Sequence, residues 1–222
     1  QWPDPDVYVN YMGQSLSGSE NRNINRTYPG KADGTLTEMM SYGIVQLINT
    51  ENIDVTVDLH EASPEYPVIN ALIAHERAMN LASNVVVDMQ MEGVQISLEP
   101  SPTDLRGLTH RELGDHTDTL ALLMEAPNPA QGRLRDRTDE ALVLTGKSET
   151  YVKAGEIGQL YVPYDENGWP IEVRCARHVF GIERILANYS EMYEEPIIVT
   201  GMPSYDELVK NGMGPYLSEP TT

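Results

Sequence analysis

The stretch Ile53–Ser63, which reads IDVTVDLHEAS, decides the fold class that the sequence predicts. Apolar and polar residues alternate from Val55 to His60, which is the period-two pattern of a half-buried strand. In an open α/β sheet, ligands bind in the crevice beyond the carboxyl ends of the strands. We therefore expect a strand that places His60 and Glu61 at a ligand-binding edge.

His60 is the candidate metal ligand of this stretch. Asp58 and His60 are two residues apart, so their side chains should leave the strand on the same side. A carboxylate in that place can orient an imidazole that binds a divalent metal ion. The alternative is an ordinary histidine that forms a hydrogen bond at the end of a strand.

The flanking segments predict an α/β protein in which helices alternate with strands. Thr35 and Glu38 form a capping box, and apolar residues then recur at helical spacing, so we expect a helix over 35–49. The nearly all-apolar run 119–125 predicts a buried central strand. The other expected strands are 7–12, 68–74, 94–98 and 197–200, and the other expected helices are 75–90, 139–144, 151–160, 171–193 and 204–210.

Two further segments carry ionisable groups. Glu125 is expected at the carboxyl end of the buried strand, the place for a general base, although an exposed acid at a strand end is an equally simple explanation. Segment Thr109–Asp118 is rich in His, Glu and Asp, and we interpret it as a solvated loop that faces the substrate.

The loop from residue 14 to residue 30 is rich in Ser, Gly and Asn and ends in a Pro-Gly turn. It holds Arg22, Asn25 and Arg26, and guanidinium groups beside carboxamides suit a carboxylate or an oxyanion. The alternative is a solvated basic loop that balances an acidic surface.

Composition limits the partners of this 222-residue chain, which is long enough for one sizeable domain or two small ones. The net charge of −19, from 34 acidic and 15 basic residues, argues against nucleic acid and against anionic membrane surfaces as partners. No apolar run reaches the roughly 18 residues of a membrane span. The single cysteine, Cys175, excludes an intramolecular disulfide and fits a reducing compartment such as the cytoplasm.

Three motifs occur in a recognisable order. They are Asn25-Arg26-Thr27-Tyr28-Pro29-Gly30 before a capped helix, Asp58-Leu59-His60-Glu61, and an apolar strand that ends in Glu125. In this order they resemble the zinc carboxypeptidase superfamily, and most of all its branch with succinylglutamate desuccinylase and aspartoacylase. The resemblance covers roughly residues 20 to 130.

This resemblance implies a mixed, mostly parallel sheet flanked by helices and a zinc-dependent amide hydrolase. Such an enzyme removes the acyl group of an N-acyl amino acid or cleaves a C-terminal peptide bond, so the substrate is a small molecule or peptide with a carboxylate. By resemblance, His60 matches a zinc ligand, and Glu125 matches the glutamate that activates the zinc-bound water. Asn25 and Arg26 match the pair that binds the substrate carboxylate or polarises the scissile carbonyl. Arg22 is a second candidate guanidinium, because Asn21-Arg22 offers an alternative register for the same pair.

One departure from the family pattern concerns the other zinc ligands, which come from a His-x-x-Glu string upstream of the Asn-Arg motif. No such string occurs here, and no histidine precedes His60. Because the chain opens on Gln1 without an initiating Met, we expect it to be the carboxyl-terminal portion of one α/β domain that lacks an amino-terminal segment, with 131–222 as a largely helical extension. The alternatives are a non-catalytic carboxylate-binding module that has lost the site, and a metal held by Asp58 and His60 with help from elsewhere.

Overall fold

The computed structural model describes residues 3–135 and 137–217. Gln1, Trp2, Asp136 and the last five residues lie outside the described part. Two compact units alternate along the chain. The first unit comprises the chain up to Asp58 together with Ile73–Asn80 and Glu99–Leu123, and the second comprises Leu59–Leu72, Leu81–Leu98 and the chain from Met124. The expected division into one domain and a helical extension stays a prediction.

A four-stranded sheet is the central element, with the strand order β3-β6-β4-β5. Strands β3 and β6 run in parallel. The main-chain amide of Leu120 donates to the main-chain carbonyl of Asp54 at one end, and that of Asn128 donates to the carbonyl of Ala62 at the other. The α/β fold with a mixed, mostly parallel sheet flanked by helices is therefore confirmed. The strands are β3 (Val55–Ala62), β4 (Ala71–Ala74), β5 (Ser97–Pro100) and β6 (Leu120–Pro127), and each has residues in both units.

A second, two-stranded sheet lies near the start of the chain. Strand β1 (Val7–Val9) falls within the expected strand 7–12, and it pairs in antiparallel fashion with β2 (Ser15–Ser17), which the sequence did not predict. The strand expected over 197–200 is wrong. That segment has no strand structure and Ile198 is 85% exposed, so its apolar residues have no neighbouring strand to pair with.

Helix α1 (Leu36–Glu51) begins where the sequence predicted a helix. The Thr35 hydroxyl accepts a hydrogen bond from the Glu38 amide at 3.3 Å, and the Glu38 carboxylate accepts one from the Thr35 amide at 2.8 Å, so the capping box is present. Glu38 is buried and also accepts a hydrogen bond from the Tyr8 hydroxyl at 3.0 Å.

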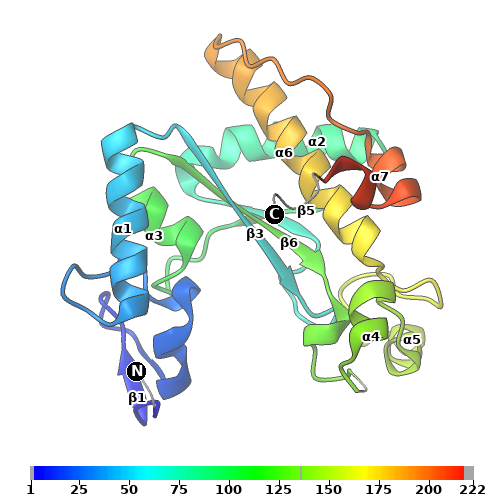
Figure 1. Cartoon of the computed structure of the whole chain (residues 1–222), viewed down its shortest axis with the longest axis horizontal. Helices are drawn as coiled ribbons and strands as arrows, with labels where there is room; N and C mark the ends of the chain where they lie inside the picture. Colours follow the sequence, from blue (N-terminus) through cyan, green and yellow to red (C-terminus); the bar gives the residue numbers. More distant parts are fainter. Residues whose placement is uncertain (1–2, 136, 218–222) are drawn as a thin grey trace, which may run out of the picture. The chain divides into compact units, whose positions relative to one another are not determined.

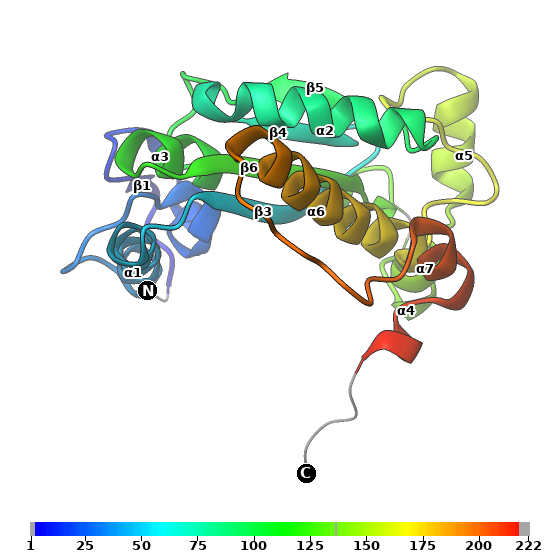
Figure 2. The ribbon, with the colours of Figure 1, turned by 90° about the horizontal axis from the view of Figure 1, so that it is seen from above.

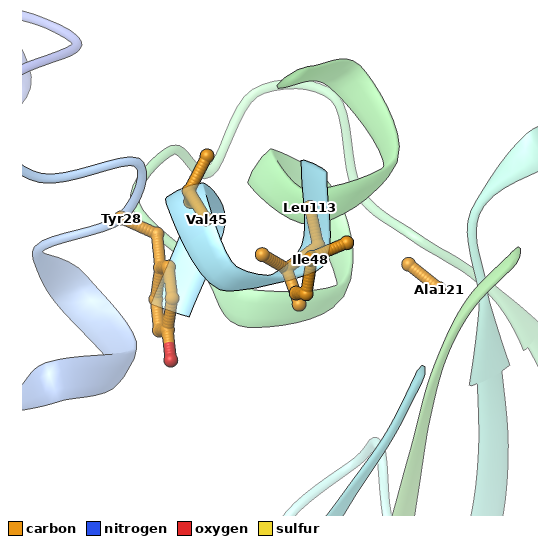
Figure 3. Close-up of a cluster of buried hydrophobic side chains, with 5 residues drawn as sticks. All are labelled: Tyr28, Val45, Ile48, Leu113 and Ala121. Atoms are coloured by element: carbon orange, nitrogen blue, oxygen red, sulfur yellow. The ribbon is translucent and has the colours of Figure 1, made fainter. Parts of the chain in front are cut away.

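The apolar face of α1 packs into a cluster in the first unit (Figure 3). This cluster brings together helix α1, the loop before it, helix α3 (Thr109–His116) and strand β6, and α1 lies beside α3 in Figure 1. Burial of Tyr28 in this cluster holds the loop that carries Asn25 and Arg26 against helix α1. The buried members are Tyr28, Val45, Ile48, Leu113 and Ala121.

Helix α3 corrects the expectation of a solvated loop over 109–118. Most of its residues are buried, and Leu113 contributes to the apolar cluster while the ionisable groups pair with one another. Glu112 is fully buried and accepts hydrogen bonds from Arg106 at 2.7 Å through both carboxylate oxygens. His116 lies one helical turn further on, 3.3 Å from Glu112, a spacing that the sequence analysis overlooked.

The ion pairs continue from α3 to the start of the second predicted helix. Arg111, nearly buried, donates to Glu76 at 2.9 and 2.6 Å and to Asp115 at 2.9 Å. Its hydrogen bonds lower the pKa of Glu76 to about 2. Burial would raise the pKa of Asp115, but hydrogen bonds from His75 and Arg111 outweigh it and lower that pKa. Two carboxylates therefore stay charged in the folded protein at a pH where they would be protonated in the unfolded chain.

We expect Arg111→Gln to remove a pH-dependent part of the stability. Because the folded pKa of Glu76 lies below its ordinary value of 4.5, the pair stabilises the protein above pH 4.5, and this contribution is lost as the pH falls towards 2. Denaturant midpoints measured from pH 7 to pH 3 should show a gap between the wild type and the variant that narrows below pH 4.5. Arg22→Gln, which removes an exposed pair with Asp4, is the control and should change the midpoint little. A difference in midpoint between the wild type and Arg111→Gln that stays constant with pH would show that Arg111 does not lower the pKa of Glu76.

The expected helix 75–90 is divided in two. His75 caps a short 3₁₀ helix, η3 (Glu76–Ala78), by accepting a hydrogen bond from the Arg77 amide. Helix α2 (Met79–Met91) follows directly.

Helix α6 (Ile171–Tyr193) has the predicted bounds and is the longest helix of the second unit. It lies beside α2 in both views (Figures 1 and 2), and Asn188 of α6 donates to Asp88 of α2 at 2.7 Å. No helix in the described part of the chain is both long and apolar enough to cross a membrane. Three further α-helices, each near a predicted one, are α4 (Glu140–Thr145), α5 (Glu149–Glu156) and α7 (Tyr205–Asn211).

Candidate active site

His60 and Glu125 face each other on neighbouring parallel strands, and both residues belong to the second unit. His60 lies on β3 and Glu125 on β6, and the imidazole Nδ1 is 3.8 Å from the carboxylate Oε1. Both residues lie two positions before the end of their strands, and not at the end itself as the sequence predicted. Their side chains are 28% and 13% exposed, so both groups are partly buried.

A second, tighter set of contacts surrounds Glu61, the residue after His60. The Arg174 guanidinium of α6 donates to one oxygen of the Glu61 carboxylate at 2.5 Å, and the Asn128 side chain donates to the other at 2.6 Å. Successive residues of a strand point to opposite faces of a sheet. Glu61 is thus tied to α6 and to the end of β6, while His60 is directed to the other face with Glu125.

His178, one turn after Arg174 on α6, contacts the main chain beside this site. Burial lowers the pKa of His178, while Glu61 and a hydrogen bond with the main chain of His60 act in the opposite direction. Its imidazole is therefore neutral at pH 7.

Asn25 is fixed in the first unit by helix α3. The Asn25 side-chain oxygen accepts hydrogen bonds from the Thr109 amide at 2.7 Å and from the Thr109 hydroxyl at 2.9 Å, and the residue is buried. Because the amide of Thr109 can only donate, the oxygen of Asn25 must face it. The NH₂ group of Asn25 is then the part of this side chain that is left to bind an anion or a carbonyl oxygen.

Arg26 and Arg22, the candidate guanidiniums, have different surroundings in the first unit. The Arg26 side chain is 28% exposed, donates to the Asn25 carbonyl at 2.6 Å and lies 3.8 Å from Glu20. Arg22 is more exposed and forms a two-pronged ion pair with Asp4, at 2.8 and 2.7 Å. The structure therefore brings Asn25 together with Arg26 in one unit and His60 together with Glu125 in the other. The convergence of all four residues on one substrate stays a prediction.

Gly107 holds the Asn25–Arg26 turn against the loop before α3. Its φ is +90°, and a Cβ there would collide with the carbonyl oxygen of Arg26, so only glycine fits. We expect Gly107→Ala to lower the free energy of unfolding by about 2 kcal/mol or more, through backbone strain and this collision. Gly93→Ala is the matched control, because Gly93 also has a positive φ, +84°, but has open space around it. Denaturant unfolding should show a clearly smaller loss of unfolding free energy for Gly93→Ala. Equal losses in the two variants would contradict the close approach of Gly107 to the Arg26 carbonyl.

A zinc ion fits this site only in part. Catalytic zinc takes three protein ligands and keeps one position open. Among the described residues, no group of three or more His, Cys, Asp or Glu side chains is placed to hold a metal ion. His60 is a suitable single ligand, but the described residues do not complete the set.

Comparisons of the chain with protein-family models, with curated proteins and with solved structures gave no match. The site therefore has to be judged from its own geometry. The residues that the sequence analysis missed are Glu61 as an anchor, Arg174 and Asn128. A signal for Arg174 was present, because it lies three and seven residues before Arg177 and Gly181, on the stripe of α6 that is buried.

Proposed function

We propose that the protein is a metallohydrolase of the deacylase or carboxypeptidase type that cleaves an amide bond in a substrate with a carboxylate. The observation that supports this most directly is the pair of His60 and Glu125, 3.8 Å apart on adjacent parallel strands. An imidazole and a carboxylate that are sheltered but still accessible are the groups that general acid–base chemistry requires.

In this proposal Glu125 is the general base. It takes a proton from the attacking water and later delivers it to the leaving nitrogen of the amide. Its low exposure, 13% of the side chain, would limit competition from bulk water.

Arg26 and Asn25 are proposed to bind the charged parts of the substrate. A guanidinium can stabilise the oxyanion that forms at the amide carbon or pair with the substrate carboxylate. The Asn25 NH₂ group would donate beside it, because Thr109 already occupies the oxygen. Arg22 is the weaker candidate, since Asp4 already engages its guanidinium. These arginines would allow an acidic protein to bind an anionic substrate.

We propose zinc as the cofactor on the strength of the resemblance. When bound, it would act as a Lewis acid at the scissile carbonyl. His60 is the ligand that the described residues would supply, and the remaining ligands are not identified among them.

Hydrolysis of a panel of N-acyl amino acids and short peptides, with zinc supplied and product amines quantified by mass spectrometry, tests the proposal. We expect release of amines from substrates with a carboxylate, loss of release with a chelator, and no reaction with the matching carboxamides. Substrate binding without turnover would instead support the non-catalytic carboxylate-binding module. Equal turnover of carboxylates and carboxamides would contradict the proposed role of the arginines.

A further inference from the structure

Helix α6 carries two residues, one turn apart, that both contact the end of β3. We propose that Arg174 and His178 are positioning residues for the pair of His60 and Glu125, with Glu61 as the link between Arg174 and the strand. This inference rests on the proposed function, because it assigns to the helix the task of holding the hydrolytic pair in place.

The environment of Arg174 is that of an anchor. Its side chain is 2% exposed, and besides Glu61 it donates to the carbonyl of Trp169 at 3.1 Å and to the carbonyl of Val143. A buried guanidinium is strongly unfavourable without a carboxylate partner, so Glu61 cannot leave its place without a large cost. The Arg174 guanidinium thus joins the start of α6 to β3 through the ion pair with Glu61, and to α4 through the hydrogen bond to the Val143 carbonyl.

The geometry of β3 explains why such an anchor matters. β3 is the first strand of the described sheet, with β6 as its neighbour, so the described strands hold it from one side only. Glu61 is held on one face by Arg174 and Asn128. The imidazole of His178 lies near the main chain of His60. Since successive residues of a strand point to opposite faces of a sheet, holding Glu61 on one face keeps the Cβ of His60 directed to the face where Glu125 lies.

The functional consequence concerns the distance between His60 and Glu125. At 3.8 Å the two groups are in range of each other but beyond an ordinary hydrogen bond, so a small shift of β3 would separate them or change their angle. A displacement of about 1 Å at a reacting group can cost about 100-fold in rate. Loss of the anchor should therefore act on turnover more than on substrate binding.

The test compares two buried arginines on the same helix. Arg174→Gln removes the anchor, and Arg177→Gln removes a 5%-exposed arginine whose hydrogen bonds go to Asn70 and Gln95. Both variants are measured at a temperature where circular dichroism shows them folded. We expect Arg174→Gln to lower kcat by about 100-fold with KM changed less than about threefold, and Arg177→Gln to lower kcat by less than about threefold.

Nuclear magnetic resonance supplies a readout that does not depend on activity. The chain has five histidines, and the ring signals of His60 are identified by their absence in His60→Gln. We expect these signals to shift in Arg174→Gln and to stay in place in Arg177→Gln. A shift without any hydrolysis in the wild type would support the positioning and contradict the proposed function. Unmoved His60 signals in Arg174→Gln, or equal effects of the two variants on kcat, would overturn the inference.

Variants of the other two residues cover the case in which Arg174→Gln does not fold. Glu61→Gln preserves the size of the side chain but removes its charge, and it should also lower kcat. His178→Gln can still donate to the main chain of His60 and should retain more turnover than His178→Leu. Equal turnover of the two His178 variants would remove His178 from the proposal.

Discussion

Glu125→Gln is expected to lower kcat by about 10²–10⁴-fold while leaving the protein folded. The amide is nearly the same size as the carboxylate, so the packing of β6 is preserved, but it cannot accept the proton of the attacking water. KM should change little, because the residues proposed to bind the substrate carboxylate, Asn25 and Arg26, are untouched.

Steady-state kinetics on the best substrate of the panel checks this prediction, and thermal unfolding of the variant shows whether it is folded. Glu61→Gln, the same change at the neighbouring carboxylate of the site, is a matched comparison with a smaller expected loss. Turnover of Glu125→Gln at the wild-type rate would show that Glu125 is not the base.

Glu61→Leu is expected to destabilise the protein by about 3 kcal/mol. It leaves the charge of Arg174, whose side chain is 2% exposed, without its carboxylate partner. This expected loss of stability is at the lower end of the range for breaking buried ion pairs, because the Glu61 side chain is 28% exposed.

Denaturant unfolding measures this loss, and the double variant Glu61→Leu/Arg174→Met is its control. An apolar pair in place of the ion pair should recover much of the stability, because no charge is then buried without a partner. A double variant as unstable as Glu61→Leu would show that packing, and not the uncompensated charge, dominates at this position.

Much of the fold was predictable from local sequence signals. Helix α1 was found by its capping box, β6 by its apolar run, and α6 by its apolar periodicity. Each of these signals arises within a few residues of the chain, which is why a sequence pattern can show it. The segment 197–200 shows the limit, since its apolar run resembles a strand but no neighbouring strand pairs with it.

Helix α3 was missed because the ion pairs that permit its burial do not show in an apolar or polar sequence pattern. Its ionisable side chains look solvated in the sequence, yet Arg106 and Arg111 compensate Glu112 and Asp115 in the folded protein. The four-residue spacing of Glu112 and His116 was the local signal that favoured a helix.

The candidate site was predictable where each residue had its own local motif. His60 and Glu125 follow from two separate strand patterns, and the structure places them side by side. Arg174 was not predicted, because its partner Glu61 lies 113 residues away and no pattern within α6 identifies that partner.

The central claim is that His60 and Glu125 act together as one hydrolytic unit. Turnover of the double variant His60→Gln/Glu125→Gln, compared with both single variants, is the most direct test. Residues that act as a unit lose most of their contribution when either is removed, so we predict that the double variant is no slower than the slower single variant. If the fold-loss in kcat of the double variant equals the product of the losses in the two single variants, the claim is contradicted. Wild-type turnover in the double variant would also contradict it.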